Sequence, residues 1–236
     1  MSRSIRPVTD AAGAARLYDE IIEPSFPPTE RVSRDEFVAA AASGTFEVLA
    51  ARDGDGYLGA VVGGRHGAAY LVHWLAVGGG RRGGGTGSAL VTAGVQRWLS
   101  QPGVRAVLAE IERPGLFAAH PQYGDPARRL AFYQRRGAAV LDLPYYQPAV
   151  AAGAPRVRNL LLAVLAARDP APPPRVLTPE ETAAVRSLLL ATMGPAEAGD
   201  AETARVYAAL DAPAGLRLLP LAEHARVPLL DPPEAG

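Results

Sequence analysis

The sequence predicts a mixed α/β fold, in which a twisted, mostly antiparallel sheet of about seven strands has helices on both faces and carries a helical C-terminal extension. Three strand-like segments follow one another across short, turn-like gaps, which is typical of an antiparallel meander. Helical patterns lie on either side of this meander. A proline-rich stretch that begins near residue 169 marks a change in composition.

The first half of the chain predicts two helices before the meander. Asp10 is a suitable N-cap for a helix that reaches about residue 22, and a second helix, with Asp35 and Glu36 in its first turn, is expected to start at Ser33 and reach about residue 42. Three prolines in residues 24–30 require a loop between them. The predicted strands of this half are residues 4–8, 45–52, 57–64 and 69–77.

The second half continues the alternation. Apolar residues at three-to-four spacing predict a helix over residues 86–99, and a further amphipathic helix over 127–136 ends at Gly137, which suits a left-handed C-cap. A long loop over residues 114–125 precedes that second helix. The predicted strands of this half are residues 104–111, 138–143 and 157–165.

These patterns predict a domain over residues 1–168, a stiff linker over 169–176 and a C-terminal extension over 177–236. Thr178 as N-cap, followed by proline and by glutamate at the third helical position, predicts a helix to about residue 193. A second helix is expected over 198–210, and we expect the last residues to be disordered.

Composition excludes several classes of function. The 24 basic residues balance the 24 acidic residues, which argues against binding to nucleic acid or to a membrane surface. Every basic residue is arginine, so lysine chemistry is excluded, and the absence of cysteine excludes thiolate and disulfide chemistry. The four histidines are scattered, so no metal site is expected. No apolar run reaches transmembrane length, and we expect a cytoplasmic protein.

The most distinctive segment joins the end of a predicted strand to a predicted helix through a glycine-rich turn. Seven of the ten residues from 78 to 87 are glycine. Glycines let successive backbone N–H groups converge, and the helix N-terminus adds positive potential, so the turn suits a pyrophosphate. A flexible surface loop is the alternative. A Walker-type loop would need a lysine, and the glycine spacing does not match a dinucleotide fingerprint.

Residues 82–87, Arg-Gly-Gly-Gly-Thr-Gly, match the Q/R-x-x-G-x-G/A signature, and the chain here resembles the GNAT acetyltransferase superfamily over roughly residues 4–166. The resemblance implies the GNAT fold, with the sheet splayed near Val77, and acetyl-CoA as donor. It implies that the strand backbone at Leu75, Ala76 and Val77 binds the pantetheine arm. It also implies that the pyrophosphate is bound by the backbone amides of Arg82, Gly83, Gly84, Gly85, Thr86, Gly87 and Ser88. Gly84 stands where many members carry a basic residue.

A second segment, Phe132-Tyr133 followed by Gly137, resembles the later helix of the same superfamily. The resemblance implies that Tyr133 hydrogen-bonds or protonates the departing CoA thiolate, a role open to a phenol. The alternative is an aromatic pair that anchors the helix to the sheet. Many members carry an asparagine about two turns earlier, where this chain has Asp125-Pro126, so the corresponding pantetheine contact is in doubt.

The general base that would deprotonate an amine has several candidates. His73 shares one strand face with Leu75 and Val77 by alternation, and an imidazole suits proton transfer near neutral pH. A structural histidine in the core is the alternative. Glu110 and Glu112 are rivals at the end of the following strand, with a solvated pair or a salt bridge to Arg113 as their structural explanation.

The expected acceptor is a primary amine of a small molecule or peptide, and the expected assembly is a monomer or homodimer. Candidate acceptor-binding segments are residues 22–31, 115–123 and 145–148, which are rich in tyrosine, histidine or proline. One rival is a non-catalytic acyl-CoA sensor or structural protein with the same fold. A methyltransferase is a second rival, but it would need an acidic residue before the glycines, where Val77-Gly78 stands.

Overall fold

The computed structural model describes residues 4–54, 56–79, 84–149 and 155–230. These residues fall into two units, each described by itself below. The first unit takes in residues up to 65 together with 70–102, and the second takes in 66–69, 103–149 and residues from 155 onward.

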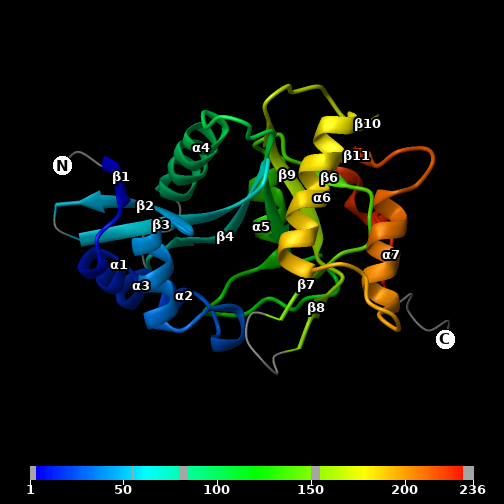
Figure 1. The fold of residues 1–236 in the computed structure, drawn as a ribbon. Helices are drawn as coiled ribbons and strands as arrows, with labels where there is room; N and C mark the ends of the chain where they lie inside the picture. The colour runs from blue at the N-terminus through cyan, green and yellow to red at the C-terminus, as the bar shows by residue number, and fades with distance from the viewer. Residues whose placement is uncertain (1–3, 55, 80–83, 150–154, 231–236) are drawn as a thin grey trace. The chain divides into compact units, whose positions relative to one another are not determined.

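The sheet of the first unit is the predicted antiparallel meander (Figure 1). Its β1 and β2 pair antiparallel with Val8 opposite Val48, and β2 and β3 pair antiparallel with Val48 opposite Val62. A register shift between Ala51 and Arg52 interrupts the second pair. The strands lie in the order β1 (Ser4–Val8), β2 (Phe46–Asp53), β3 (Gly56–His66) and β4 (Ala69–Val77).

The helices before the meander begin at the predicted positions. The Asp10 carboxylate accepts a hydrogen bond of 2.7 Å from the Gly13 amide, and Ser33 forms a capping box with Glu36. The first predicted helix is not a single α-helix, because α-helix α1 is followed directly by the π-helical turn η1. The elements are α1 (Ala11–Leu17), η1 (Tyr18–Ile22), α2 (Glu23–Ser25), η2 (Pro28–Glu30) and α3 (Arg34–Ser43).

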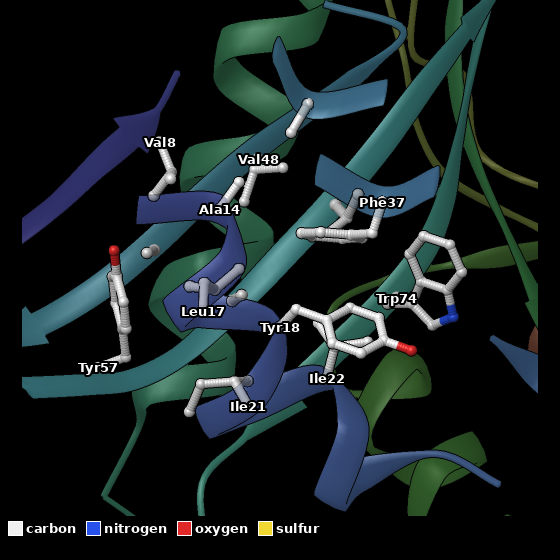
Figure 2. Close-up of a cluster of buried hydrophobic side chains, with 14 of the residues drawn as sticks. Val8, Ala14, Leu17, Tyr18, Ile21, Ile22, Phe37, Val48, Tyr57 and Trp74 are labelled. Atoms are coloured by element: carbon white, nitrogen blue, oxygen red, sulfur yellow. The ribbon is translucent and has the colours of Figure 1, made fainter. Parts of the chain in front are cut away.

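A hydrophobic core lies between these helices and one face of the meander (Figure 2). Phe37 is at its centre, with ring centroids 5.4 Å from Tyr18 and 6.0 Å from Trp74. The two polar rings also find backbone acceptors, since Tyr18 donates to the Val32 carbonyl and Trp74 donates to the Glu30 carbonyl. This core therefore fixes the loop of residues 26–32 as well as the two helices.

Helix α4 (Thr86–Leu99) covers the other face of the meander. Trp98 is fully buried and stacks on the Tyr70 ring with centroids 5.2 Å apart. On β3, Val61 and Gly63 face α4, whereas the alternate residues Ala60 and Val62 belong to the opposite core. Helices on both faces of an antiparallel sheet are thus confirmed for this unit.

Among the described residues of the second unit, the larger group of paired strands has five members, in the order β5 (Ala106–Ile111), β9 (Leu161–Ala167), β6 (Ala139–Leu141), β11 (Arg217–Pro220) and β10 (Arg175–Val176). Their pairings are antiparallel. A separate antiparallel ribbon joins β7 (Tyr146–Gln147) to β8 (Val157–Arg158). Helix α5 (Pro126–Gln134) contacts β5.

The predicted single strand over residues 157–165 is wrong, because the chain changes direction within it. Asn159 has a left-handed backbone with φ of 62°, which separates β8 from β9. Its side-chain carbonyl accepts a hydrogen bond of 2.9 Å from the Leu230 amide. A polar contact with a distant part of the chain thus accompanies a backbone conformation that alternation could not reveal.

The C-terminal region contains the predicted helices together with unpredicted strands. Thr178 and Glu181 form the expected capping box of α6 (Pro179–Met193), and α7 (Ala201–Leu210) follows. The short strand β11 pairs with β6 and precedes η3 (Leu221–Arg226). The boundaries proposed above for domain, linker and extension stay a prediction, and residues 231–236 lie outside the described residues.

No helix among the described residues has the length and apolar character needed to cross a membrane.

We predict that Gly63→Ala destabilises the protein. A Cβ at Gly63 would lie 2.6 Å from an indole carbon of Trp98, and the rigid, fully buried ring has no flexible end that could move aside. Overpacking of this kind costs about 1–3 kcal/mol. Urea unfolding should show the loss. Gly56→Ala on the same strand is the control, since its nearest atom would be 3.9 Å away; equal losses in both variants would contradict the prediction.

Candidate functional site

The first part of the candidate site is the connection from β4 to α4. Helix α4 begins at Thr86, as predicted, and its N-cap is Gly85, whose φ of 76° is left-handed. Residues 80–83 lie outside the described residues, so the positions predicted for Arg82 and Gly83 are not described. Gly84, Gly85, Thr86, Gly87 and Ser88 are described, and Thr86 is buried.

The start of α4 is chemically suited to an anion. No side chain of the described residues caps this helix, whereas α1, α3, α5, α6 and α7 each begin at a side-chain cap. The N–H groups of a first helical turn have no partner within the helix, and the helix dipole is positive at this end. Phosphate oxygens could therefore occupy the position that a serine or aspartate side chain takes at the other helices.

The strand that leads into this turn has one buried and one less buried face. Trp74 and Ala76 belong to the core, whereas His73, Leu75 and Val77 are partly exposed. The predicted alternation of His73, Leu75 and Val77 on one face is thus confirmed. Whether the backbone of residues 75–77 binds a pantetheine arm stays a prediction.

Gly59 on β3 was not expected to matter, yet it allows the end of β4 to approach. A Cβ at this position would lie 2.4 Å from the Ala76 carbonyl oxygen and 3.1 Å from the Val77 Cα. One residue before it, the Leu58 carbonyl accepts a hydrogen bond of 2.9 Å from the Gly78 amide. A glycine inside a strand often marks a close backbone approach, and this signal was present in the sequence.

His73 lies among aromatic side chains. Its ring centroid is 5.1 Å from that of Phe46 and 5.6 Å from that of Trp74. These contacts suit a histidine that helps to cover the core, and they are also compatible with an imidazole on the exposed face of β4.

Tyr133 lies on α5 in the second unit and is 5% exposed. Its ring meets that of Phe132 edge to face, with centroids 5.0 Å apart. No described residue forms a hydrogen bond with its hydroxyl group. Burial raises the pKa of Tyr133 to about 12, although the charges of Arg129 and Arg136 act in the opposite direction. The phenol is therefore protonated throughout the physiological pH range.

Glu110, near the end of β5, is held by two neutral donors. The Tyr145 hydroxyl donates to Oε1 over 2.6 Å, and the Gln147 side-chain amide donates to Oε2 over 2.6 Å. Burial raises the pKa of Glu110, because it disfavours the charged carboxylate, while the two hydrogen bonds oppose this shift. Glu110 is thus the predicted site residue with the most organised surroundings.

The interpretation of Glu112 as a partner of Arg113 is wrong. Glu112 pairs with Arg129 of α5 over 2.7 Å, and Arg129 also donates to the Tyr123 carbonyl. Arg113 is 6% exposed and instead donates to the carbonyls of His224, Val227 and Pro228. The sequence distance of more than a hundred residues explains why no local pattern indicated this contact.

The segments suggested for acceptor binding differ in exposure. In the loop before α5, the rings of His120 and Tyr123 stack with centroids 4.5 Å apart and remain accessible. Tyr145 and Tyr146 are instead 0% and 1% exposed, and the Tyr146 hydroxyl pairs with Thr203. These two tyrosines support the interior of the second unit and are not acceptor-facing surface residues.

Asp125, which stands near the position of the expected asparagine, has a structural role. Its carboxylate caps α5 by accepting hydrogen bonds from the Ala127 and Arg128 amides. The same carboxylate is 3.6 Å from the Arg128 guanidinium.

The structure thus groups the predicted residues by unit. His73, residues 75–77 and the described part of the glycine-rich turn belong to the first unit. Glu110 and Tyr133 belong to the second, on a strand and a helix that contact each other. Arg129, Tyr145 and Gln147 were not predicted as partners of glutamates, because hydrogen bonds across 17 to 37 residues leave no periodic signal.

Comparison with known proteins gives a fold likeness only. No family model matches the chain, and no curated protein matches it. An acetyltransferase assigned to the GNAT family from Bacteroides thetaiotaomicron is similar, with 22% identity and a TM-score of 0.57 over 79% of this chain and 95% of that one.

Two further solved structures match with TM-scores of 0.51. YncA of Salmonella typhimurium, described as an acetyltransferase and solved with acetyl-CoA, is 17% identical over 75% of this chain and all of that one. The diaminobutyrate acetyltransferase EctA of Paenibacillus lautus, solved with L-2,4-diaminobutyric acid and coenzyme A, is 16% identical over 72% of this chain and 98% of that one. The chain therefore has the fold of the GNAT acetyltransferases.

Proposed function

We propose that this protein is an N-acetyltransferase that moves the acetyl group of acetyl-CoA to a primary amine of a small molecule or peptide. The observation that carries the proposal is the junction of β4 and α4, where a glycine-rich connection leads to a helix that no described side chain caps. The signature over residues 82–87 occupies this junction, in the fold of proteins solved with acetyl-CoA or CoA.

In the proposed reaction, the main-chain amides at the start of α4 bind the diphosphate of acetyl-CoA, and the backbone of residues 75–77 binds the pantetheine arm. The less buried face of β4 and the close approach allowed by Gly59 support this arrangement. The amine attacks the thioester carbonyl directly, so the acetyl group passes from sulfur to nitrogen without an acyl-enzyme. His73 and Glu110 are the candidates for removing the amine proton.

The proposed role of Tyr133 follows from its acidity. A thiol has a pKa of about 8.5, so complete proton transfer from a phenol with a pKa of about 12 to a thiolate is unfavourable by several kcal/mol. A hydrogen bond from the protonated phenol to the developing thiolate has no such cost. Tyr133 therefore acts as a hydrogen-bond donor to the leaving group.

The proposal also includes the cytoplasmic location and the monomeric or homodimeric state expected above.

The general test combines binding with turnover. Isothermal titration with CoA should show saturable binding, and thiol release from acetyl-CoA should increase with at least one member of a panel of primary amines, amino acids and peptide N-termini. Binding without acetylation of any amine would favour the non-catalytic sensor. Absence of CoA binding would reject both.

We predict that Gly87→Asp weakens CoA binding at least tenfold without destabilising the protein. An acidic side chain in the first turn of α4 interacts favourably with the helix dipole but repels a diphosphate bound at the same amides. Isothermal titration and thermal unfolding measure the two effects. Gly87→Ala is the uncharged control. Equal CoA affinity of the two variants would exclude the start of α4 as the diphosphate site.

We predict that Tyr133→Phe lowers kcat by about 100-fold while the Kd for CoA stays within about twofold, because the hydroxyl acts only as sulfur gains charge. Steady-state thiol release and titration calorimetry test this. Tyr207→Phe is the control, since the Tyr207 hydroxyl donates to the Gly194 carbonyl elsewhere in the second unit. Unchanged kcat in Tyr133→Phe would show that the phenol merely anchors α5.

A further inference from the structure

Glu110 differs from Glu112 and Glu181, two other organised carboxylates of the second unit, in the kind of partner it has. Glu112, two residues along the chain, pairs with the Arg129 guanidinium, and Glu181 pairs with Arg175. Among the described residues, no cation forms an ion pair with Glu110. Its partners are the neutral Tyr145 hydroxyl and the neutral Gln147 amide, one on each carboxylate oxygen.

This arrangement fixes the carboxylate without neutralising its charge. Each carboxylate oxygen can accept about two hydrogen bonds, so one lone pair on each remains after the Tyr145 and Gln147 contacts. Both donors come from the short segment that follows β6, and Tyr145 is fully buried, so its ring cannot move freely. The carboxylate is therefore oriented, and it can still accept a proton.

Among the described residues of the second unit, the neighbours of Glu110 on β9 and α5 add no opposing charge. Its partner across the β5–β9 pair is the apolar Leu162. On α5, which contacts β5, the Arg129 guanidinium pairs with Glu112, and Tyr133 is protonated. The pKa of Glu110 is raised by burial, and that of Tyr145 is raised well above its ordinary value by burial and by Glu110 itself. Tyr145 therefore remains a donor across the working pH range.

We infer that Glu110 is the general base of the proposed transfer and that Tyr145 and Gln147 are positioning residues that orient its carboxylate. This inference rests on the proposed acetyltransferase function and chooses between the two candidate bases. His73, by contrast, lies among the rings of Phe46 and Trp74.

The step balances without any further reactant. A carboxylate oxygen of Glu110 takes a proton from the amine nitrogen as the nitrogen lone pair forms the bond to the acetyl carbon. The carbon–sulfur bond then breaks, and the electron pair leaves with the CoA thiolate, which accepts the hydrogen bond of Tyr133. Glu110 returns its proton to solvent, and the thiolate is protonated there according to pH. The net products are the acetylated amine and CoA.

The decisive experiment compares two adjacent, buried tyrosines. Tyr145→Phe removes a donor that stabilises the Glu110 carboxylate, so the pKa of Glu110 should rise and the ascending limb of kcat/KM against pH should move to higher pH by about one unit. Tyr146→Phe removes a hydroxyl that pairs with Thr203 instead, so the limb should stay in place. Gln147→Met should move the limb in the same direction as Tyr145→Phe.

The kinetic assay uses acetyl-CoA and whichever amine of the panel is turned over fastest, so the acceptor's own ionisation is common to all variants. A second readout needs no acceptor: the Glu110 carboxyl is titrated by ¹³C NMR, with Glu110→Gln identifying its signal. Tyr145→Phe should shift this titration upward and Tyr146→Phe should not. If Tyr145 has only a structural role, the rate falls and the ascending limb of kcat/KM stays in place even though the NMR titration of Glu110 shifts.

The outcomes separate this inference from the proposed function. If Glu110→Gln loses at least 100-fold in kcat and the NMR and kinetic shifts agree, the assignment holds. If the wild-type protein acetylates an amine but Glu110→Gln retains its kcat, or His73→Gln alone abolishes the ascending limb, the inference is overturned and the function stands. If the wild-type protein acetylates no amine, the function fails and this inference fails with it.

Discussion

The first unit depends on close contacts at positions where no side chain fits. On β3, Gly59 lies against the backbone of β4, and Gly63 lies against the indole of Trp98. A Cβ added at Gly94 of α4 would lie only 3.0 Å from the same indole. These contacts determine how near α4 lies to the sheet. The glycine-rich connection can therefore end in a helix whose start is anchored by the buried Thr86 and, one turn later, by the buried Leu90. Close packing of the sheet thus supports the proposed anion site.

The second unit shows how one class of side chain can serve two purposes. Glutamates paired with arginine, such as Glu112 and Glu181, hold helices α5 and α6 in place. Glu110 receives hydrogen bonds of similar length but no compensating charge, which is unfavourable for stability in a partly buried setting. Proteins retain such groups where chemistry requires them, and this physical distinction, more than proximity to a motif, separates Glu110 from its neighbours.

The sequence indicated the elements whose signals are local. The caps at Asp10 and Thr178, the helix start near Ser33, the meander and the start of α4 were predicted because side-chain periodicity and capping chemistry act within a few residues. Strands β10 and β11 were not predicted, since they are short and their partners are distant in the chain. At the site, sequence indicated Glu110 and Tyr133 as candidates. It could not show that Tyr145 holds the former, because that contact depends on tertiary folding.

Arg113 has a consequence for how the C-terminal segment tolerates change. Its buried guanidinium donates to three main-chain carbonyls between His224 and Pro228 and contacts no acidic side chain there. A cation that binds only the peptide backbone is indifferent to the side chains of the segment it holds. Residues 224–228 can therefore vary in chemistry among homologous proteins while their path is preserved. An alignment of homologous sequences should then show arginine retained at position 113 while residues 224–228 vary.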